Sequence, residues 1–94
     1  MSNATDVGAV LEQRGSRYGK FDLHANVTQR LKTVVRSELV VRNKVLAADQ
    51  QEALDMIMHK VGRIINGDPD YSDSWIDIAG YATLVAQRLD SDAA

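Results

Sequence analysis

A short segment near the N-terminus combines residue types that bind phosphorylated ligands. Residues 14–21 read Arg-Gly-Ser-Arg-Tyr-Gly-Lys-Phe. The three cations suit phosphate oxygens, the two aromatic rings offer faces on which a base can stack, and the glycines permit a close backbone approach. We predict that a nucleotide or another phosphorylated small ligand is held by Arg14, Arg17, Tyr18 and Lys20. The alternative is a structural connector whose rings close one end of the fold while its cations remain solvated.

Two pairs of acidic residues have a spacing that can bind Mg²⁺. Glu52 and Asp55 are three positions apart, and Asp73 and Asp77 are four positions apart. Hard cations require several carboxylate oxygens around one ion. In an antiparallel helical hairpin, Asp55 lies about 15 Å along the helix from the turn, whereas the second pair lies beside the turn. We therefore expect the two pairs to meet only between subunits, or if the helices begin and end at other residues than predicted.

Two further cations, Lys60 and Arg63, lie near the same turn of the predicted hairpin. They face Asp73 and Asp77, so one interpretation is a network of salt bridges that holds the two helices together. In the other interpretation, Lys60 and Arg63 assist the residues of 14–21 in binding phosphate.

The remaining candidates for catalysis give little signal. His59 follows Asp55 by four positions, which favours a histidine held by a carboxylate over a transition-metal ligand. His24 indicates nothing by its position. The chain has no Cys and no Gly-x-Ser-x-Gly motif, so nucleophilic catalysis has no support and we assign no catalytic residue and no resident cofactor.

The elements that must position these residues are helices. We predict helices over about 5–14 and 23–43, a third that starts at Asp49 and stops before Gly67, and a fourth that opens at Ser72 or Asp73. Asp49 and Glu52 have the spacing of a capping box. Asp22 is the expected cap of the second helix, Thr5 or Asp6 that of the first. On the fourth helix, we expect one inward-facing stripe of apolar residues: Trp75, Ile78, Ala79, Ala82, Val85, Ala86 and Leu89.

These signals predict an all-α fold: a short N-terminal helix followed by a three-helix bundle that ends in a tight hairpin. With 94 residues, one domain spanning 1–94 is expected, with flexible ends at about 1–4 and 90–94. The small core expected at this length, and small residues on the fourth helix that permit close helix packing, favour a homo-oligomer.

The charge is distributed unevenly along the chain. Residues 14–44 carry eight Lys and Arg against two acidic residues, whereas residues 45–94 carry three against nine. The two halves can therefore satisfy each other within or between subunits, and the net charge of −2 makes nucleic acid an unlikely partner. No apolar run reaches the roughly 20 residues needed to span a membrane. Together with the absence of Cys, this predicts a cytoplasmic protein with no membrane partner.

Three stretches of the sequence stand out: Arg-Tyr-Gly-x-Phe at 17–21, His-Lys-x-x-Arg-Ile-x-x-Gly-Asp-Pro at 59–69, and Asp-x-Trp-x-Asp-Ile-Ala-Gly-Tyr-Ala at 73–82. With them the chain resembles a family of small all-helical proteins of unknown function that is common in tailed bacteriophages and prophages. The resemblance extends over residues 12–89 and implies a phage or prophage origin, and hence the cytoplasm of a host cell. Members sometimes carry the label phosphofructokinase, but 94 residues without a Gly-rich phosphate loop cannot house a sugar kinase.

A more distant likeness links the chain to the all-α nucleoside triphosphate pyrophosphohydrolases. Those enzymes bind magnesium through Glu-x-x-Glu and Glu-x-x-Asp motifs on two helices. Here the matching pairs are Glu52 with Asp55, and Asp73 with Asp77. The second pair departs from the family pattern because it is spaced by four positions, which puts the metal site in doubt.

Three functions follow as hypotheses. The first is a phage-type accessory protein that binds a nucleotide or phosphorylated ligand without catalysis, acting as a counter-defence sponge. The second is a magnesium-dependent nucleoside triphosphate pyrophosphohydrolase. The third is an inhibitor that binds a host or defence enzyme through the acidic loop at 66–73.

Overall fold

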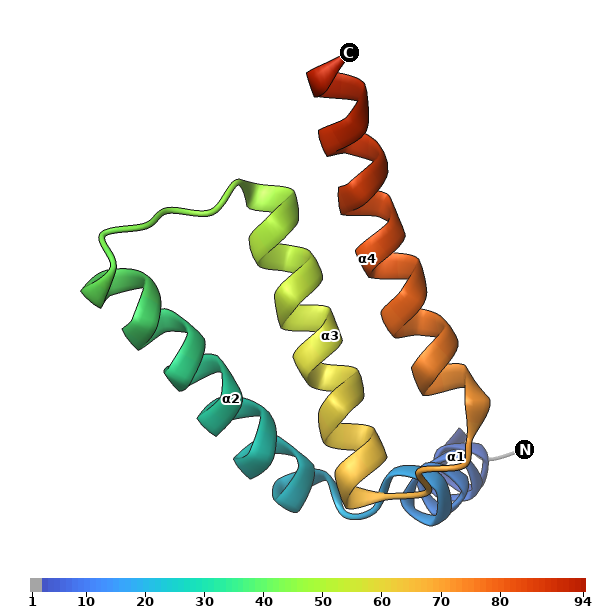
Figure 1. Cartoon of the computed structure of the whole chain (residues 1–94). Coiled ribbons are helices and arrows are strands. Elements are labelled where there is room, and N and C mark those ends of the chain that lie inside the picture. The colour runs from blue at the N-terminus through green and yellow to red at the C-terminus, as the bar shows by residue number, and fades with distance from the viewer. Residues whose placement is uncertain (1–2) are drawn as a thin grey trace.

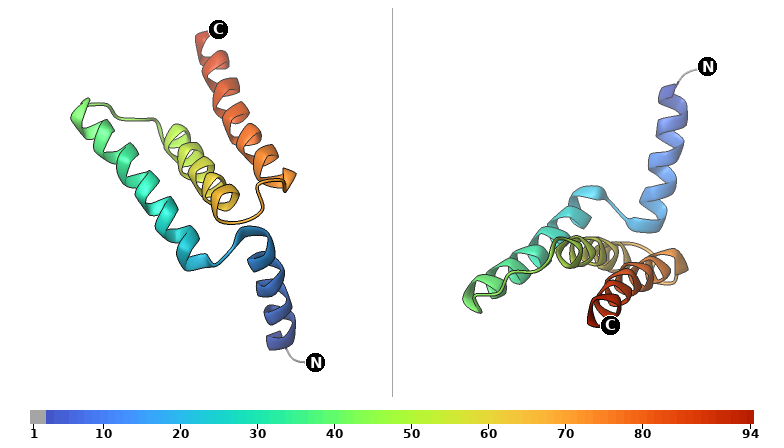
Figure 2. Two further views of the ribbon diagram at one scale, coloured as in Figure 1. Left: turned by 60° about the horizontal axis from the view of Figure 1, so that its bottom comes forward. Right: turned by 90° about the horizontal axis from the view of Figure 1, so that it is seen from above.

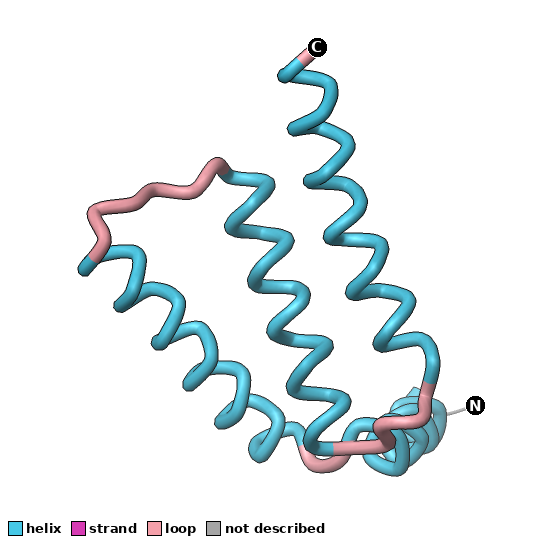
Figure 3. Tube along the Cα trace, in the orientation of Figure 1, coloured by secondary structure: helices cyan, strands magenta, loops and turns pink. Residues whose placement is uncertain are grey.

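The computed structural model describes residues 3–94 as four helices joined by short connections (Figures 1 and 3). The helices are α1 (Asn3–Tyr18), α2 (Phe21–Val41), α3 (Ala48–Asn66) and α4 (Ser72–Ala93). No strand occurs among these residues, so the predicted all-α fold is confirmed. None of the described helices is long and apolar enough to cross a membrane.

The three long helices lie side by side in one layer. α3 occupies the centre, with α2 along one side and α4 along the other (Figure 1). Within the described residues, α2 and α4 do not contact each other. α1 crosses the base of the layer and projects away from it (Figure 2). The radius of gyration is 16.3 Å, well above the roughly 12 Å of a compact chain of this length.

α1 is longer than its sequence pattern indicated. The prediction of a helix that stops at Gly15 is wrong, because the helix continues through Tyr18. The chain turns instead at Gly19, whose φ of +79° places it in the left-handed region that favours glycine. Of the expected flexible N-terminal residues 1–4, the first two lie outside the described residues and the other two begin α1. Thr5 and Asp6 lie within α1, so neither is its cap.

The start of α2 also differs from the prediction. Lys20 is the N-cap residue and provides no side-chain cap. Asp22, the expected cap, lies in the first turn, where its carboxylate accepts a hydrogen bond from the Leu23 backbone N–H at 3.0 Å. At its other end, α2 stops at Val41, two residues before the predicted end.

The start of α3 lies near the predicted residue, but its cap is different. The backbone N–H of Ala47 donates to Oε1 of Gln50 at 2.9 Å, so the predicted box of Asp49 and Glu52 is wrong. Asp49 is instead engaged in the first turn by Arg88 of α4, through two hydrogen bonds of 2.6 and 2.9 Å. α4 begins at Ser72 as predicted and continues through Ala93.

The contact between α2 and α3 is close and small. Gly62 of α3 lies against His24 and Thr28 of α2, and all three residues are buried. A Cβ atom at position 62 would approach the His24 ring to 2.9 Å, so only glycine permits this approach without adjustment.

α4 packs less completely than its apolar stripe predicted. Ile78 and Val85 are half-buried as expected, but five other members of the stripe are exposed: Trp75, Ala79, Ala82, Ala86 and Leu89. The prediction that these five face the protein interior is wrong for the single chain. The physical reason is that α4 touches α3 alone among the long helices, so the rest of its apolar circumference has no partner within the chain.

Candidate functional site

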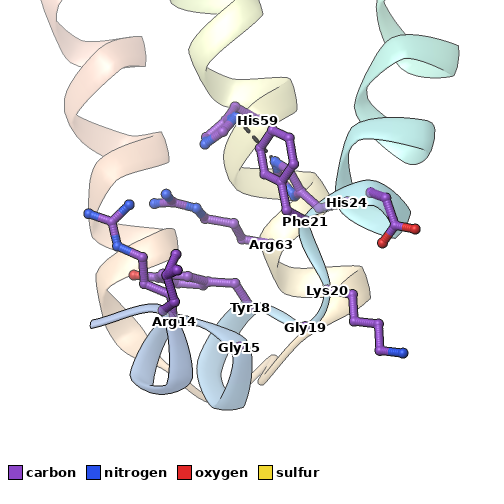
Figure 4. A pocket seen from close by; sticks show the side chains of 11 residues that line it. Arg14, Gly15, Tyr18, Gly19, Lys20, Phe21, His24, His59 and Arg63 are labelled. Atoms are coloured by element: carbon purple, nitrogen blue, oxygen red, sulfur yellow. Dashed lines mark hydrogen bonds between the residues drawn. The ribbon is translucent and has the colours of Figure 1, made fainter. Parts of the chain in front are cut away.

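A cavity of about 770 Å³ lies where the end of α1, the start of α2 and the last turns of α3 meet (Figure 4). Its volume falls within the range of small-molecule sites. Its wall combines cations, aromatic rings and histidines: Leu11, Arg14, Gly15, Tyr18, Gly19, Lys20, Phe21, Asp22, His24, His59 and Arg63. The cavity therefore contains much of the 14–21 segment that the sequence singled out.

Tyr18 on the cavity wall belongs to a row of two aromatic rings with a guanidinium group at each end, and the far end of this row lies outside the cavity. The Arg63 guanidinium lies over the Tyr18 ring, 4.1 Å from its centroid. Tyr18 makes an edge contact with Tyr71, with ring centroids 6.1 Å apart, and the Arg17 guanidinium lies 4.5 Å from the Tyr71 centroid. One face of Tyr18 is therefore covered by Arg63, which fixes that guanidinium at the cavity wall.

The α3–α4 connection holds the turn between α1 and α2 in place. Nδ2 of Asn66 donates to the backbone oxygens of Tyr18 and Lys20, each at 2.9 Å. The backbone N–H of Asp68 donates to the Arg17 carbonyl at 2.6 Å. Gly67 lies so close to this turn that any side chain would overlap the Tyr18 backbone. The acidic loop, expected to be a binding surface, thus positions the cavity-lining turn.

Two histidines form the inner end of the cavity. Nε2 of His24 lies 3.2 Å from Nδ1 of His59, and the rings meet edge to face with centroids 4.5 Å apart. Burial lowers the pKa of both rings, and the neighbouring Arg63 lowers both further. The pKa of His59 falls to about 4. Both rings are therefore neutral near pH 7 and can share one hydrogen bond.

Four of the six predicted ligand-binding residues line this cavity: Arg14, Tyr18, Lys20 and Arg63. The Lys20 side chain points away from Arg63 and the histidines, so it contributes at the rim (Figure 4). Arg17 lines an adjoining small cavity of about 190 Å³ together with Arg14 and Tyr71. Lys60 lies elsewhere, because its ammonium group is 2.9 Å from the Asp77 carboxylate on the α4 side of α3.

The acidic residues do not gather around one point in the described part of the chain, where no group of three or more candidate metal ligands occurs. Asp77 makes the predicted salt bridge with Lys60. Asp73 accepts a 2.8 Å hydrogen bond from the Tyr71 hydroxyl, and Asp55 accepts one of 3.2 Å from Gln51. Glu52 lines a separate crevice beside α4. Arg63 lies on Tyr18 and so takes no part in the hairpin network.

Sequence reasoning missed the histidine pair. His24 and His59 are 35 positions apart, and neither has a neighbour in the sequence that indicates the other. The one available signal was Gly62 in the middle of an apolar helical stripe, because an interior glycine favours close helix contact at that turn.

The cavity has the chemistry of an anion site with an apolar wall. Arg14 and Arg63 contribute guanidinium groups, which bind phosphate by paired hydrogen bonds. The first turn of the 21-residue helix α2 also lines the cavity, but its Asp22 carboxylate lines the cavity too and accepts a hydrogen bond from the Leu23 N–H of that turn, so the positive charge of the site comes from the guanidinium groups. Leu11 and Phe21 supply the apolar surface on which a base or a ring can lie.

Comparison with known proteins identifies a family without assigning chemistry to it. The model of a domain of unknown function, DUF6378, matches residues 3–89, nearly the whole chain. No curated protein and no solved structure matches the chain. The chain therefore belongs to the DUF6378 family.

Proposed function

We propose that the cavity between α1, α2 and α3 binds a phosphorylated small ligand of the nucleotide class and does not convert it. The observation that carries the proposal is the placement of Arg14 and Arg63 on the wall of one 770 Å³ cavity that also contains the start of α2. Two guanidinium groups suit a phosphate group better than they suit a neutral ligand.

The aromatic residues of the cavity support a nucleotide over inorganic phosphate. Phe21 is 77% exposed and lies beside the cavity, so a base can stack on its ring without displacing another side chain. Tyr18 is less available because Arg63 covers one of its faces. We therefore propose that Phe21 contacts the base, while Arg14 and Arg63 contact the phosphates and Tyr18 holds Arg63 in place.

The experiment is isothermal titration calorimetry of the protein with a panel of nucleoside mono- and triphosphates and cyclic nucleotides, with and without Mg²⁺. In the variant Arg63→Gln, we expect affinity to fall about tenfold or more, because one charged hydrogen-bonding partner of phosphate is lost. Arg30→Gln is the matched control, since Arg30 is exposed on α2 and does not line the cavity. Equal affinity of the two variants, or no binding to any nucleotide, contradicts the proposal.

Two further assays separate the other two functions: pyrophosphate release from the same nucleotides, and recovery of a partner enzyme. Release of pyrophosphate that requires Mg²⁺ and disappears in Asp77→Asn would replace simple binding with hydrolysis. The inhibitor would be favoured if the protein bound no nucleotide and wild-type protein recovered a host or defence enzyme from lysate. The Asp68→Lys variant should then fail to recover that enzyme. Asp68 suits this variant because its side chain is exposed in the loop.

We propose a phage-type setting for this binding, based on the three sequence stretches at 17–21, 59–69 and 73–82. A small nucleotide-binding protein without chemistry can act there as a counter-defence sponge, which removes a signalling nucleotide by stoichiometric binding. The cytoplasm of the host cell is the proposed site of action, consistent with a Cys-free chain. The sponge requires tight binding and slow release, and both are measurable in the calorimetric and kinetic titrations of the same nucleotide panel.

A further inference from the structure

α3 carries an uncharged stripe on the side of the layer away from the cavity. Leu54, Ile57, Val61 and Ile65 follow one another at three- or four-residue spacing and so lie on one side of the helix. Arg63, on the cavity wall, lies on nearly the opposite side at 100° per residue. Ile65 is 63% exposed and Leu54 36%, while Ile57 and Val61 are half-buried, so the chain itself covers the stripe only in part.

α4 continues this apolar surface. Trp75, Ala82, Ala86 and Leu89 lie within one third of the helix circumference, and all four are exposed. An apolar crevice of about 340 Å³ is lined by Ala82 of α4 together with Leu54 and Ile57 of α3. The stripes of α3 and α4 are therefore adjacent on the same side of the layer.

α2 extends the surface on the other side of α3. Leu23, Val27 and Val34 lie on the part of α2 that is turned away from Phe21, and Phe21 lines the cavity. Leu23 and Val34 are exposed, and Val27 is half-buried. The three stripes together form a broad and mainly apolar surface opposite the cavity, which we call the open face. Two exposed charged residues of α2 lie beside its stripe, because Arg30 falls between Val27 and Val34 at helical spacing and Glu38 follows Val34 by four positions.

The chain exposes more surface than a compact protein of its mass. Its accessible surface is 6787 Å² at 10.4 kDa, whereas a folded monomer of this mass exposes about 5,400 Å². The excess of roughly 1,400 Å² is shared between the layer and the projecting helix α1, and it exceeds the approximately 800 Å² that each partner buries in a standard stable interface. Only Ala53 and Met58 are buried among the apolar residues that the structure describes. The single chain thus lacks the core that a stable domain requires.

We infer that a second copy of this chain packs its open face against the first, so that two three-helix layers enclose one shared core. The open face suits a copy of itself because each half would offer the same mainly apolar surface, and a twofold arrangement lets one patch serve both partners. Ala82 and Ala86 lack bulk, so a helix of the partner can approach α4 closely. The cavity faces the other way, so this assembly and the proposed ligand site are independent.

The experiment is sedimentation velocity from low to high micromolar concentration, with two variants matched in exposure. Ile65 on the open face and Leu84 on the other side of α4 are both 63% exposed. We expect the wild-type and Leu84→Glu proteins to be dimeric. For Ile65→Glu we expect the dissociation constant of the dimer to rise about 100-fold or more, because burying an unpaired carboxylate in the interface is costly. A wild-type monomer at every concentration overturns the inference, as does an Ile65→Glu protein that dimerises normally.

The single tryptophan provides a second measurement if Ile65→Glu fails to fold. Trp75 is 55% exposed in one chain, and its ring is held by a 2.8 Å hydrogen bond from Nε1 to the Pro69 carbonyl. In the dimer the ring is covered, so wild-type emission is shifted to shorter wavelength and acrylamide quenches it weakly. Dilution must reverse both signals as the dimer dissociates. Strong quenching that is the same at all concentrations overturns the inference.

Discussion

The two faces of the helical layer are built from different kinds of side chain. The cavity face contains the histidine pair, the stack of Arg63 and Tyr18, and the ion pair of Asp49 with Arg88. The open face contains mainly aliphatic residues and one tryptophan, with charge only beside the α2 stripe, at Arg30 and Glu38. On the cavity face, directional contacts within the chain fix one helix against the next. On the open face, the chain makes few contacts of its own.

This difference separates two tasks that a larger domain performs with one core. Hydrogen bonds and ion pairs set the relative positions of α2, α3 and α4, because they are directional and need particular partners. Apolar burial supplies most of the folding free energy, and here the surface that would supply it remains uncovered in the single chain. Contacts within the chain thus set the relative positions of the helices. If two copies pack as proposed, we expect the larger part of the folding free energy to come from that packing.

The largest effect on stability is expected from disrupting the contact between α2 and α3, which supports both faces of the layer. Gly62→Val places methyl groups against His24 and Thr28, forcing α2 away from α3 and lowering the free energy of unfolding by about 3 kcal/mol. Gly80→Val is the matched control, since a Cβ at position 80 meets no atom within 4 Å. Urea unfolding followed by circular dichroism measures both. Similar stabilities of the two variants would show that the α2–α3 contact does not hold the layer together.

A smaller effect is expected from removing the ion pair between α3 and α4. Asp77→Asn leaves the buried Lys60 ammonium without its carboxylate, and we expect a loss of about 2 kcal/mol. Lys60→Met removes the charge and keeps the side-chain length, so it should be less destabilising than Asp77→Asn. Chemical denaturation of the two single variants and the double variant measures the coupling. Additive effects in the double variant would mean that the pair contributes nothing to the hairpin.

The smallest effect on stability is the pH dependence expected from His59, which lies on the cavity face. Burial lowers the pKa of His59 to about 4, so below the ordinary value of about 6.5 the unfolded chain binds a proton that the folded chain does not. Stability is therefore lost as the pH falls from 6.5 towards 4, by about 1 kcal/mol at pH 5 because the ring keeps part of its hydration. Urea unfolding at pH 7 and pH 5 measures the loss, and His59→Leu should reduce it. A pH dependence that His59→Leu leaves unchanged would assign the titration to another group.

Parts of the fold and of the candidate site follow from local sequence. Ser72 opens α4 as predicted, and Lys60 meets Asp77 because an antiparallel hairpin places the end of one helix beside the start of the next. Arg14 and Tyr18 lie near each other because they are four positions apart on α1, although the cavity that they line also needs α2 and α3. Each of these features depends on neighbours within a few turns of the chain.

Other features had no local signal. Gly15 was expected to end α1, but a glycine inside a helix is tolerated where the following turn is held by other contacts. Here Asn66, 48 positions after Tyr18, holds the turn because its side-chain amide donates a hydrogen bond to the Tyr18 carbonyl. For Arg63, the sequence left a place in the hairpin network and a place beside residues 14–21 both open. The structure puts its guanidinium over Tyr18, because the α1–α2 turn is brought to the end of α3.

The sequence alone determined the positions of most of the helices, the uneven distribution of charge and the apolar stripe along each long helix, because helical periodicity and charge are properties of consecutive residues. The tertiary structure alone decided which stripes are buried, which cations share a cavity, and that His24 meets His59. These outcomes depend on contacts between residues tens of positions apart, and such contacts exist only once α1 lies across the base of the layer and α3 lies between α2 and α4.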